Sequence, residues 1–186
     1  RSGEWAGGEK WTPAGTAEVL QQAGIADMKY VERAILSRLR AMTEADFAAL
    51  PDGGAGEGLP DRLARAAKNA SALEEFYALA KTRRYAHARI RRLALRAFLG
   101  LREENTPQDP QYLRVLAFNP RGQALLKEMK TRVALPLLTK PAHVRAQPGE
   151  AQALFGLESR ATDLFGLCFD RVRPCGLDYT TGPVRE

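Results

Sequence analysis

Residues 86–101 are predicted to form a helix that carries two separate stripes of side chains. The first stripe is apolar and recurs at the spacing of a core-facing helix, with Ile90, Leu93, Ala94, Ala97, Phe98 and Leu101. The second stripe consists of Arg89, Arg92 and Arg96, which follow one another at helical steps of three and four residues. Because the two stripes lie on different faces, the helix can pack its apolar side into a core while its arginines stay in solvent.

This helix belongs to a segment, residues 76–102, that is basic throughout. The segment contains no aspartate or glutamate and carries a charge of +8 in a chain whose net charge is +6, so the rest of the chain is slightly acidic. Concentrated positive charge attracts polyanions, because neutralising phosphates releases their condensed counterions. Seven of the eight cations are arginines, whose planar fork binds phosphate through two hydrogen bonds. An RNA or DNA backbone is therefore the expected partner, with an ordinary solvated helix face as the simpler alternative.

The candidate RNA-binding residues lie in and before this helix. They are Lys81, Arg83, Arg84, Tyr85, Arg89, Arg92 and Arg96, together with Arg62 and Arg65 on a preceding predicted helix. Lys81 to Tyr85 lie at a junction between two helices, where several donors can be aimed at one point. Tyr85 has two open interpretations: it stacks on an exposed base, or it is a core residue that orders the junction. Arg91 lies nearly opposite Arg89 on the helix, which indicates a structural role.

Periodicity and capping signals predict a mainly α fold with a small parallel β-α-β element. The helices are expected at 16–23, 28–42, 43–50, 60–70, 72–82, 86–101, 119–130 and 150–169, with buried strands at 113–118 and 135–139. Thr43 with Asp46, and Ser71 with Glu74, have capping-box spacing. Because a helix connects the two strands, they are expected to be parallel.

The chain is expected to form a single RNA-binding domain over residues 1–186. Its length and 45% hydrophobic content suffice for one good core. The expected parts are an irregular lead (1–13), a helical part with the basic segment (14–102), the β-α-β unit (111–140), and a long helix with an irregular tail (149–186). Trp5 and Trp11 are expected to fix the lead to the core or to another part of the protein.

The sequence predicts no catalytic site and no metal site within the chain. Its two histidines, His87 and His143, are far apart, and Cys168 and Cys175 lack metal-binding spacing, so reduced thiols in a cytoplasmic protein are expected. The glycine-rich segment 52–58 lacks the Gly-Lys-Ser/Thr ending of a phosphate-binding loop, which favours a flexible loop. No apolar run approaches the ~20 residues of a membrane-spanning helix, and no signal-peptide pattern is visible, so no membrane partner is expected.

Several motifs resemble those of one bacterial family, and they occur in the family's order. Residues 81–92, Lys-Thr-Arg-Arg-Tyr-Ala-His-Ala-Arg-Ile-Arg-Arg, resemble its K-T-K-R-Y-T-x-A-R-I-x-R signature. The other matches are Glu57-Gly-Leu59 with Arg62, Tyr112 to Asn119 with Gly122, Leu135 to Lys140, and Glu158 to Asp163 with Leu177 to Tyr179 and Pro183. Together they cover the chain from about Tyr30 to its end. The chain departs from the pattern at Ala86, where the family has threonine, and at Pro60-Asp61, where it has Glu-Asn.

The family is that of the tRNA(Met) cytidine acetate ligases, a HIGH-type nucleotidyltransferase family. The resemblance implies that the full-length protein uses ATP, with magnesium, and acetate to form acetyl-adenylate, and acetylates the N4 amine of the wobble cytidine in elongator tRNA(Met). The family's nucleotide-binding motifs, which belong to its N-terminal half, do not occur in this chain. The resemblance therefore implies a C-terminal, tRNA-binding half, which alone is expected to be inactive and whose cofactor-binding residues remain unknown.

Two alternatives remain open from the sequence. The chain could be a stand-alone RNA-binding module without catalytic activity, acting on tRNA or rRNA. Alternatively, its basic face could dock an acidic protein, in which case tRNA would not compete for the surface.

Overall fold

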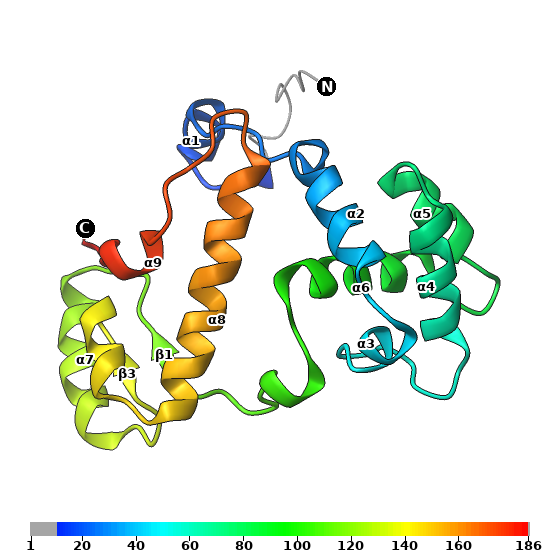
Figure 1. The fold of residues 1–186 in the computed structure, drawn as a ribbon. Helices are drawn as coiled ribbons and strands as arrows, with labels where there is room; N and C mark the ends of the chain where they lie inside the picture. Colours follow the sequence, from blue (N-terminus) through cyan, green and yellow to red (C-terminus); the bar gives the residue numbers. More distant parts are fainter. Residues whose placement is uncertain (1–10, 186) are drawn as a thin grey trace.

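The computed structural model describes residues 11–185, and it has the predicted mainly α architecture. Figure 1 shows a helical group on one side, a small group of strands and helices on the other, and one long helix between them. The α-helices are α1 (Thr16–Gln22), α2 (Glu32–Arg40), α3 (Glu44–Ala48), α4 (Leu59–Asn69), α5 (Leu73–Ala80), α6 (His87–Leu99), α7 (Pro120–Arg132), α8 (Gly149–Phe165) and α9 (Leu177–Thr180). Short 3-10 helices are η2 (Met28–Val31), η3 (Glu103–Asn105), η4 (Pro141–Ala146) and η5 (Gly166–Cys168).

The predicted parallel β-α-β unit is confirmed, but its strands are shorter than expected. Strand β1 (Leu113–Arg114) pairs in parallel with β3 (Leu137–Leu138), and α7 connects them. The expected strand 113–118 is interrupted, because a second strand, β2 (Ala117–Phe118), leaves this pair and lies beside β4 (Val184–Arg185). The tail is therefore not wholly irregular as predicted, since it returns to form this second parallel pair.

The first hydrophobic cluster joins α2 to α6. Its largest fully buried side chains are Phe47, Phe76, Ile35, Leu39, Leu59, Leu63, Ile90 and Leu93. Ile90, Leu93, Ala94 and Ala97 of α6 are all buried, as the apolar stripe predicts. This packing fixes the orientation of α6 and turns its other faces outward.

The end of α8 returns to the start of this first cluster. Helix α8 ends at Phe165, before the expected position 169, and continues as the 3-10 helix η5. The amide of Asp27 donates to the carbonyl oxygen of Cys168 over 2.7 Å, and Cys168 is buried in the first cluster. Both cysteines are free thiols, and burial raises the pKa of Cys168.

A second, smaller cluster lies around the β-α-β unit and the start of α8. It contains Tyr112, Leu138, Val144, Ala151 and Phe155, with Leu154 packed against it. The ion pair between Arg114 and Asp178, at 2.6 Å, joins β1 to α9 on the border of this cluster. Burial, followed by a hydrogen bond to Glu158, raises the pKa of Tyr112. The two clusters share one chain, and the single-domain organisation over 1–186 stays a prediction.

Local capping signals were only partly predictive. Thr43 and Asp46 form the predicted capping box at the start of α3, and Gly100 ends α6 in the left-handed region at φ 72°. The Ser71–Glu74 capping box is wrong: Ser71 bonds to Glu75, and Glu32 of α2 accepts from the amide of Leu73. A carboxylate from another helix thus takes the place of the local cap.

Trp11, the first described residue, lies outside both hydrophobic clusters. Trp11 is 87% exposed, so it does not fix the lead to them; Trp5 and most of the expected lead lie outside the described residues. Within residues 11–185, no helix combines the length and the apolar character needed to cross a membrane.

Candidate nucleic-acid interface

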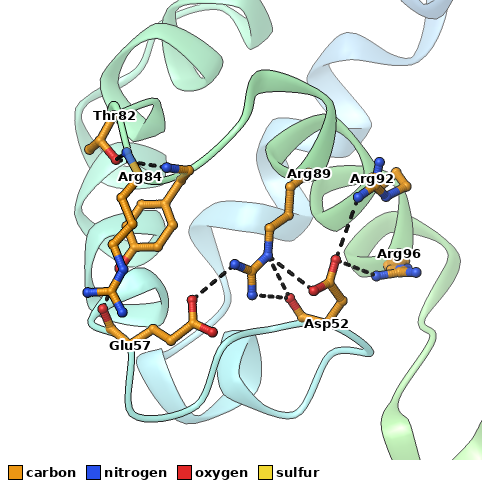
Figure 2. A network of polar contacts seen from close by, with 8 residues as sticks. Asp52, Glu57, Thr82, Arg84, Arg89, Arg92 and Arg96 are labelled. Atoms are coloured by element: carbon orange, nitrogen blue, oxygen red, sulfur yellow. Dashed lines mark hydrogen bonds and ion pairs between the residues drawn. The ribbon is translucent and has the colours of Figure 1, made fainter.

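The arginine stripe of α6 faces the glycine-rich loop between α3 and α4. Figure 2 shows the carboxylate of Asp52, in this loop, pointing at Arg89, Arg92 and Arg96. The separations are 3.2 Å to Nε of Arg89, 3.7 Å to Nη2 of Arg92 and 3.6 Å to Nη1 of Arg96. The i, i+3, i+7 spacing read from the sequence therefore does bring the three guanidinium groups together.

Arg89 is the most firmly held of the three arginines. Its Nη1 donates to Glu57 over 3.0 Å, and its Nε and Nη2 donate to the main-chain carbonyl oxygen of Asp52. The hydrogen bond that Arg89 donates to Glu57 is the main cause of its raised pKa. Burial opposes this shift, and the charge of Asp52 adds to it. Its side chain is only 20% exposed, so Arg89 orders the loop and has little surface left for a ligand.

Arg92 and Arg96 differ in how much surface they offer. Arg96 is partly buried and donates to the carbonyl oxygen of Pro51 over 2.6 Å. Arg92 is 55% exposed, and within the described residues its side chain makes the long ion pair with Asp52. Asp52 and Glu57 bring two negative charges to the three arginines, so the cluster stays positive.

The acidic partners of this cluster were missed by sequence reasoning. Asp52 and Glu57 lie more than thirty residues before the arginines they meet, whereas helical spacing predicts ion pairs only between residues three or four positions apart. The signal that could have found them is the pair of carboxylates in a glycine-rich loop, set before an acid-free basic helix. The loop is joined to α6 and to the α5–α6 junction by these contacts; its flexibility stays a prediction.

The junction between α5 and α6 is ordered by Thr82 and Tyr85. The hydroxyl of Thr82 accepts from the amides of Arg84 and Tyr85, which makes a tight turn. The hydroxyl of Tyr85 donates to the carbonyl oxygen of Glu57, tying the junction to the loop. Since the Tyr85 ring is only 6% exposed, the geometry favours the ordering interpretation over the base-stacking one.

The junction presents three cations whose side chains make few contacts with the protein. Lys81, Arg83 and Arg84 are exposed. Within the described residues, the side chains of Lys81 and Arg83 have no hydrogen bond or ion pair, and Arg84 has only its approach to the Tyr85 ring, at 5.6 Å. Cations of this kind are open to a polyanion without breaking a contact first.

The two arginines of α4, Arg62 and Arg65, make different contacts. Arg62 points toward the end of α5 and donates to the carbonyl oxygens of Leu79, Ala80 and Lys81. Arg65 is exposed and pairs with Asp61 one turn earlier. Arg62 thus supports the junction through its carbonyl groups, whereas the ion pair of Arg65 stays within α4.

The remaining candidate residues have structural contacts. Arg91 pairs with Glu74 of α5 and lies 5.3 Å from the ring of Tyr77, which agrees with the structural role expected for it. The ring of His87 packs edge-on against Tyr77, and His143 lies 3.4 Å from the hydroxyl of Thr139. Within residues 11–185 no three His, Cys, Asp or Glu side chains are grouped to hold a metal.

The fold and this surface define a helical protein with a preformed basic face suited to a polyanion. The family model for HIGH nucleotidyl transferases matches residues 2–177, and the chain belongs to this family. It is 33% identical over 157 residues to a tRNA(Met) cytidine acetate ligase of Kosmotoga olearia, covering 76% of this chain and 36% of that one. With the Syntrophomonas wolfei ligase of the same name, identity is 30% over 165 residues, covering 83% and 39%.

A solved structure has the same fold. The crystal structure of Thermotoga maritima TmcAL bound with alpha-thio ATP superposes with a TM-score of 0.78 at 25% identity, covering 91% of this chain and 44% of that one. The chain thus spans well under half the length of these relatives.

Proposed function

We propose that this chain is the tRNA-binding, C-terminal part of an ATP-dependent tRNA(Met) cytidine acetate ligase. The observation that carries the proposal is the exposed group Lys81, Arg83 and Arg84, held at an ordered junction in a chain whose relatives are named as ligases of tRNA(Met). The cations of α6, chiefly Arg92, extend this surface. In the ligase family that the chain resembles, the reaction is acetylation of the N4 amine of the wobble cytidine. The protein would act in the cytoplasm.

The role of this surface is to hold the anticodon arm. A fixed set of cations can bind the phosphates that flank an unstacked base, because these phosphates are present whichever base lies between them. Holding the arm fixes the position of the acceptor amine, and a misplacement of ~1 Å can lower the transfer rate by about a hundredfold. Lys81, Arg83 and Arg84 therefore position the substrate, and they take no part in bond making.

The glycine-rich loop 52–58 does not fit the phosphates of ATP, with or without magnesium. The glycine-rich loop, the nearest candidate for a phosphate cradle, has carbonyl oxygens of Phe47, Ala48 and Leu50 crowded around Gly53 where amide donors would be needed. Activation of acetate with ATP thus belongs to the nucleotide-binding part of the family's longer chains. We expect this chain alone to show no acetate-dependent exchange between ATP and pyrophosphate.

The test is tRNA binding by the purified chain over a range of salt concentrations. Replacing Lys81, Arg83 and Arg84 together by glutamine should weaken binding and reduce the salt slope by roughly two to three units, at ~0.9 per duplex or ~0.7 per single-strand phosphate contact. The matched control replaces Arg121, Lys127 and Arg132 by glutamine, which removes the same charge from exposed positions on α7. Equal losses in both variants would show that tRNA is attracted by net charge alone.

A further inference from the structure

The carboxylate of Asp52 lies at the centre of the arginine cluster without a hydrogen bond of its own. It approaches three guanidinium groups, yet no hydrogen bond to its oxygens occurs within the described residues. Its contacts with Arg92 and Arg96, at 3.7 and 3.6 Å, are beyond hydrogen-bonding distance. Exposed ion pairs of this length contribute little stability.

Two of the three arginines are held in place by groups other than this carboxylate. Arg89 is fixed by the carbonyl oxygen of Asp52 and by Glu57, and Arg96 by the carbonyl oxygen of Pro51. The cluster would therefore keep these two guanidinium groups where they are if the carboxylate turned away. The carboxylate is thus an anion beside two cations, Arg89 and Arg96, that do not need it for support.

The backbone at this point is fixed, so only the side chain is free to turn. Asp52 has φ 60°, a left-handed conformation that is costly for a residue with a Cβ atom. Gly53 follows, packed against the carbonyl oxygens of Phe47, Ala48 and Leu50 and bonded through its amide to Leu50. The side chain of Asp52 is 41% exposed, which leaves room for it to rotate into solvent.

We propose that Asp52 occupies a phosphate site formed by Arg92 and Arg96, and that a phosphate of a bound ligand displaces its carboxylate. A phosphate presents several acceptor oxygens to the two arginine forks and can form the short charge-assisted bonds that the carboxylate lacks. The contacts with Arg92 and Arg96 are long, but the carboxylate also gives up its 3.2 Å ion pair with Arg89. The exchange therefore favours a ligand with phosphates close together over a lone anion. Naming RNA as the natural ligand rests on the function proposed above, whereas the phosphate site itself does not.

As a competitor within the protein, the Asp52 carboxylate would change which anions the site prefers. A ligand that first engages Lys81, Arg83 and Arg84 brings its neighbouring phosphates to Arg92 at high effective concentration, and it can then replace Asp52. A ligand without neighbouring phosphates must compete unaided with a carboxylate that is always present. Asp52 thus lowers the affinity for scattered anions more than the affinity for a nucleic acid backbone.

The experiment follows the arginine Nε–Hε signals of the chain by NMR during titration with inorganic pyrophosphate. In the wild type the Arg92 and Arg96 signals should shift with weak affinity. Asp52→Asn should tighten binding roughly threefold to tenfold, because this variant has no ion pairs with Arg89, Arg92 and Arg96 that pyrophosphate must break first. Glu57→Gln is the matched control, because Glu57 faces Arg89 and not Arg92 or Arg96. The Arg91 signal should not move in any of these titrations.

Unchanged or weaker pyrophosphate binding in Asp52→Asn would overturn the proposal and would make Asp52 a residue that positions the arginines. If the asparagine variant misfolds, Asp52→Gly gives the same readout, because glycine removes the carboxylate and accepts the left-handed backbone. Parallel titrations with tRNA separate the two proposals. If Asp52→Asn binds pyrophosphate more tightly but the chain does not bind tRNA, the phosphate site is supported and the proposed function is wrong. If the chain binds tRNA but Asp52→Asn does not bind pyrophosphate more tightly, only the proposed role of Asp52 is wrong.

Discussion

Arg62 closes the end of α5 by donating from its Nε to the carbonyl oxygen of Ala80 over 2.9 Å. Its Nη2 reaches the carbonyl oxygen of Leu79 over the same distance. The last carbonyl groups of a helix have no partner within the helix, so an arginine from a neighbouring helix can satisfy them. Arg62 thus caps α5 at the point where the cation-bearing junction begins.

Replacing Arg62 by alanine should therefore destabilise the protein by about 1–3 kcal/mol, the cost of leaving partly buried carbonyl groups without donors. It should also weaken tRNA binding, because the junction that carries Lys81 and Arg83 loses its support. Urea denaturation and a tRNA titration measure the two effects. Arg65→Ala is the control, since Arg65 pairs only with Asp61 at the surface. If both variants are equally stable, α5 does not depend on this cap.

Tyr85→Phe should cost about 1 kcal/mol, because it removes the hydroxyl that donates to Glu57. The amides of residues 54–58 should exchange with solvent faster, since the loop loses its tie to the junction. Hydrogen exchange followed by NMR reports on the loop, and urea denaturation reports on the whole chain. Unaltered loop exchange would mean that Arg89 alone holds the loop to α6.

The sequence predicted those features whose causes are local. The two stripes of α6, its end at Gly100 and the Thr43–Asp46 box depend on residues a few positions apart, and all are present. The cap of α5 by Glu32, the meeting of Asp52 with the arginines and the pairing of β2 with β4 join residues distant in the chain. Such contacts follow from packing, which periodicity does not encode, so the candidate surface was located while its acidic partners were missed.

The capping box of α3 should make stability depend on pH. The amide and then the hydroxyl of Thr43 donate to Asp46, and these bonds, with a smaller contribution from Arg102, lower the pKa of Asp46 below its ordinary value. A lowered pKa in the folded state means that ionised Asp46 stabilises the fold above about pH 4 and that this contribution is lost as pH falls through the folded pKa.

Asp46→Asn should therefore be less stable than the wild type at pH 7, and the difference should shrink as the pH is lowered toward 3. Urea denaturation at several pH values measures this difference. Thr43→Ser, which keeps the hydroxyl cap, should behave like the wild type. A gap between wild type and Asp46→Asn that stays constant with pH would show that the charge of Asp46 contributes nothing.

Gly53 has no room for a side chain. A Cβ atom there would lie within 3.0 Å of the carbonyl oxygens of Phe47, Ala48 and Leu50, so Gly53→Ala should destabilise the protein by about 1–3 kcal/mol, as overpacking does. Gly182→Ala is the control, because nothing lies within 4 Å of its Cβ position. Thermal denaturation compares the two, and equal melting temperatures would show that the turn after α3 yields without cost.

The hydrogen bond between Asp27 and Cys168 has a consequence for how the protein is made. Chains emerge from the ribosome amino end first, at about 5–20 residues per second. The sulfur atoms of Met28 and Cys168 are in contact although 140 residues separate them in the chain. Synthesis of Cys168 therefore follows that of Met28 by roughly 7–28 s. During that interval the apolar side of η2 is uncovered on a nascent protein, and a chaperone that recognises apolar segments has its best opportunity to bind there.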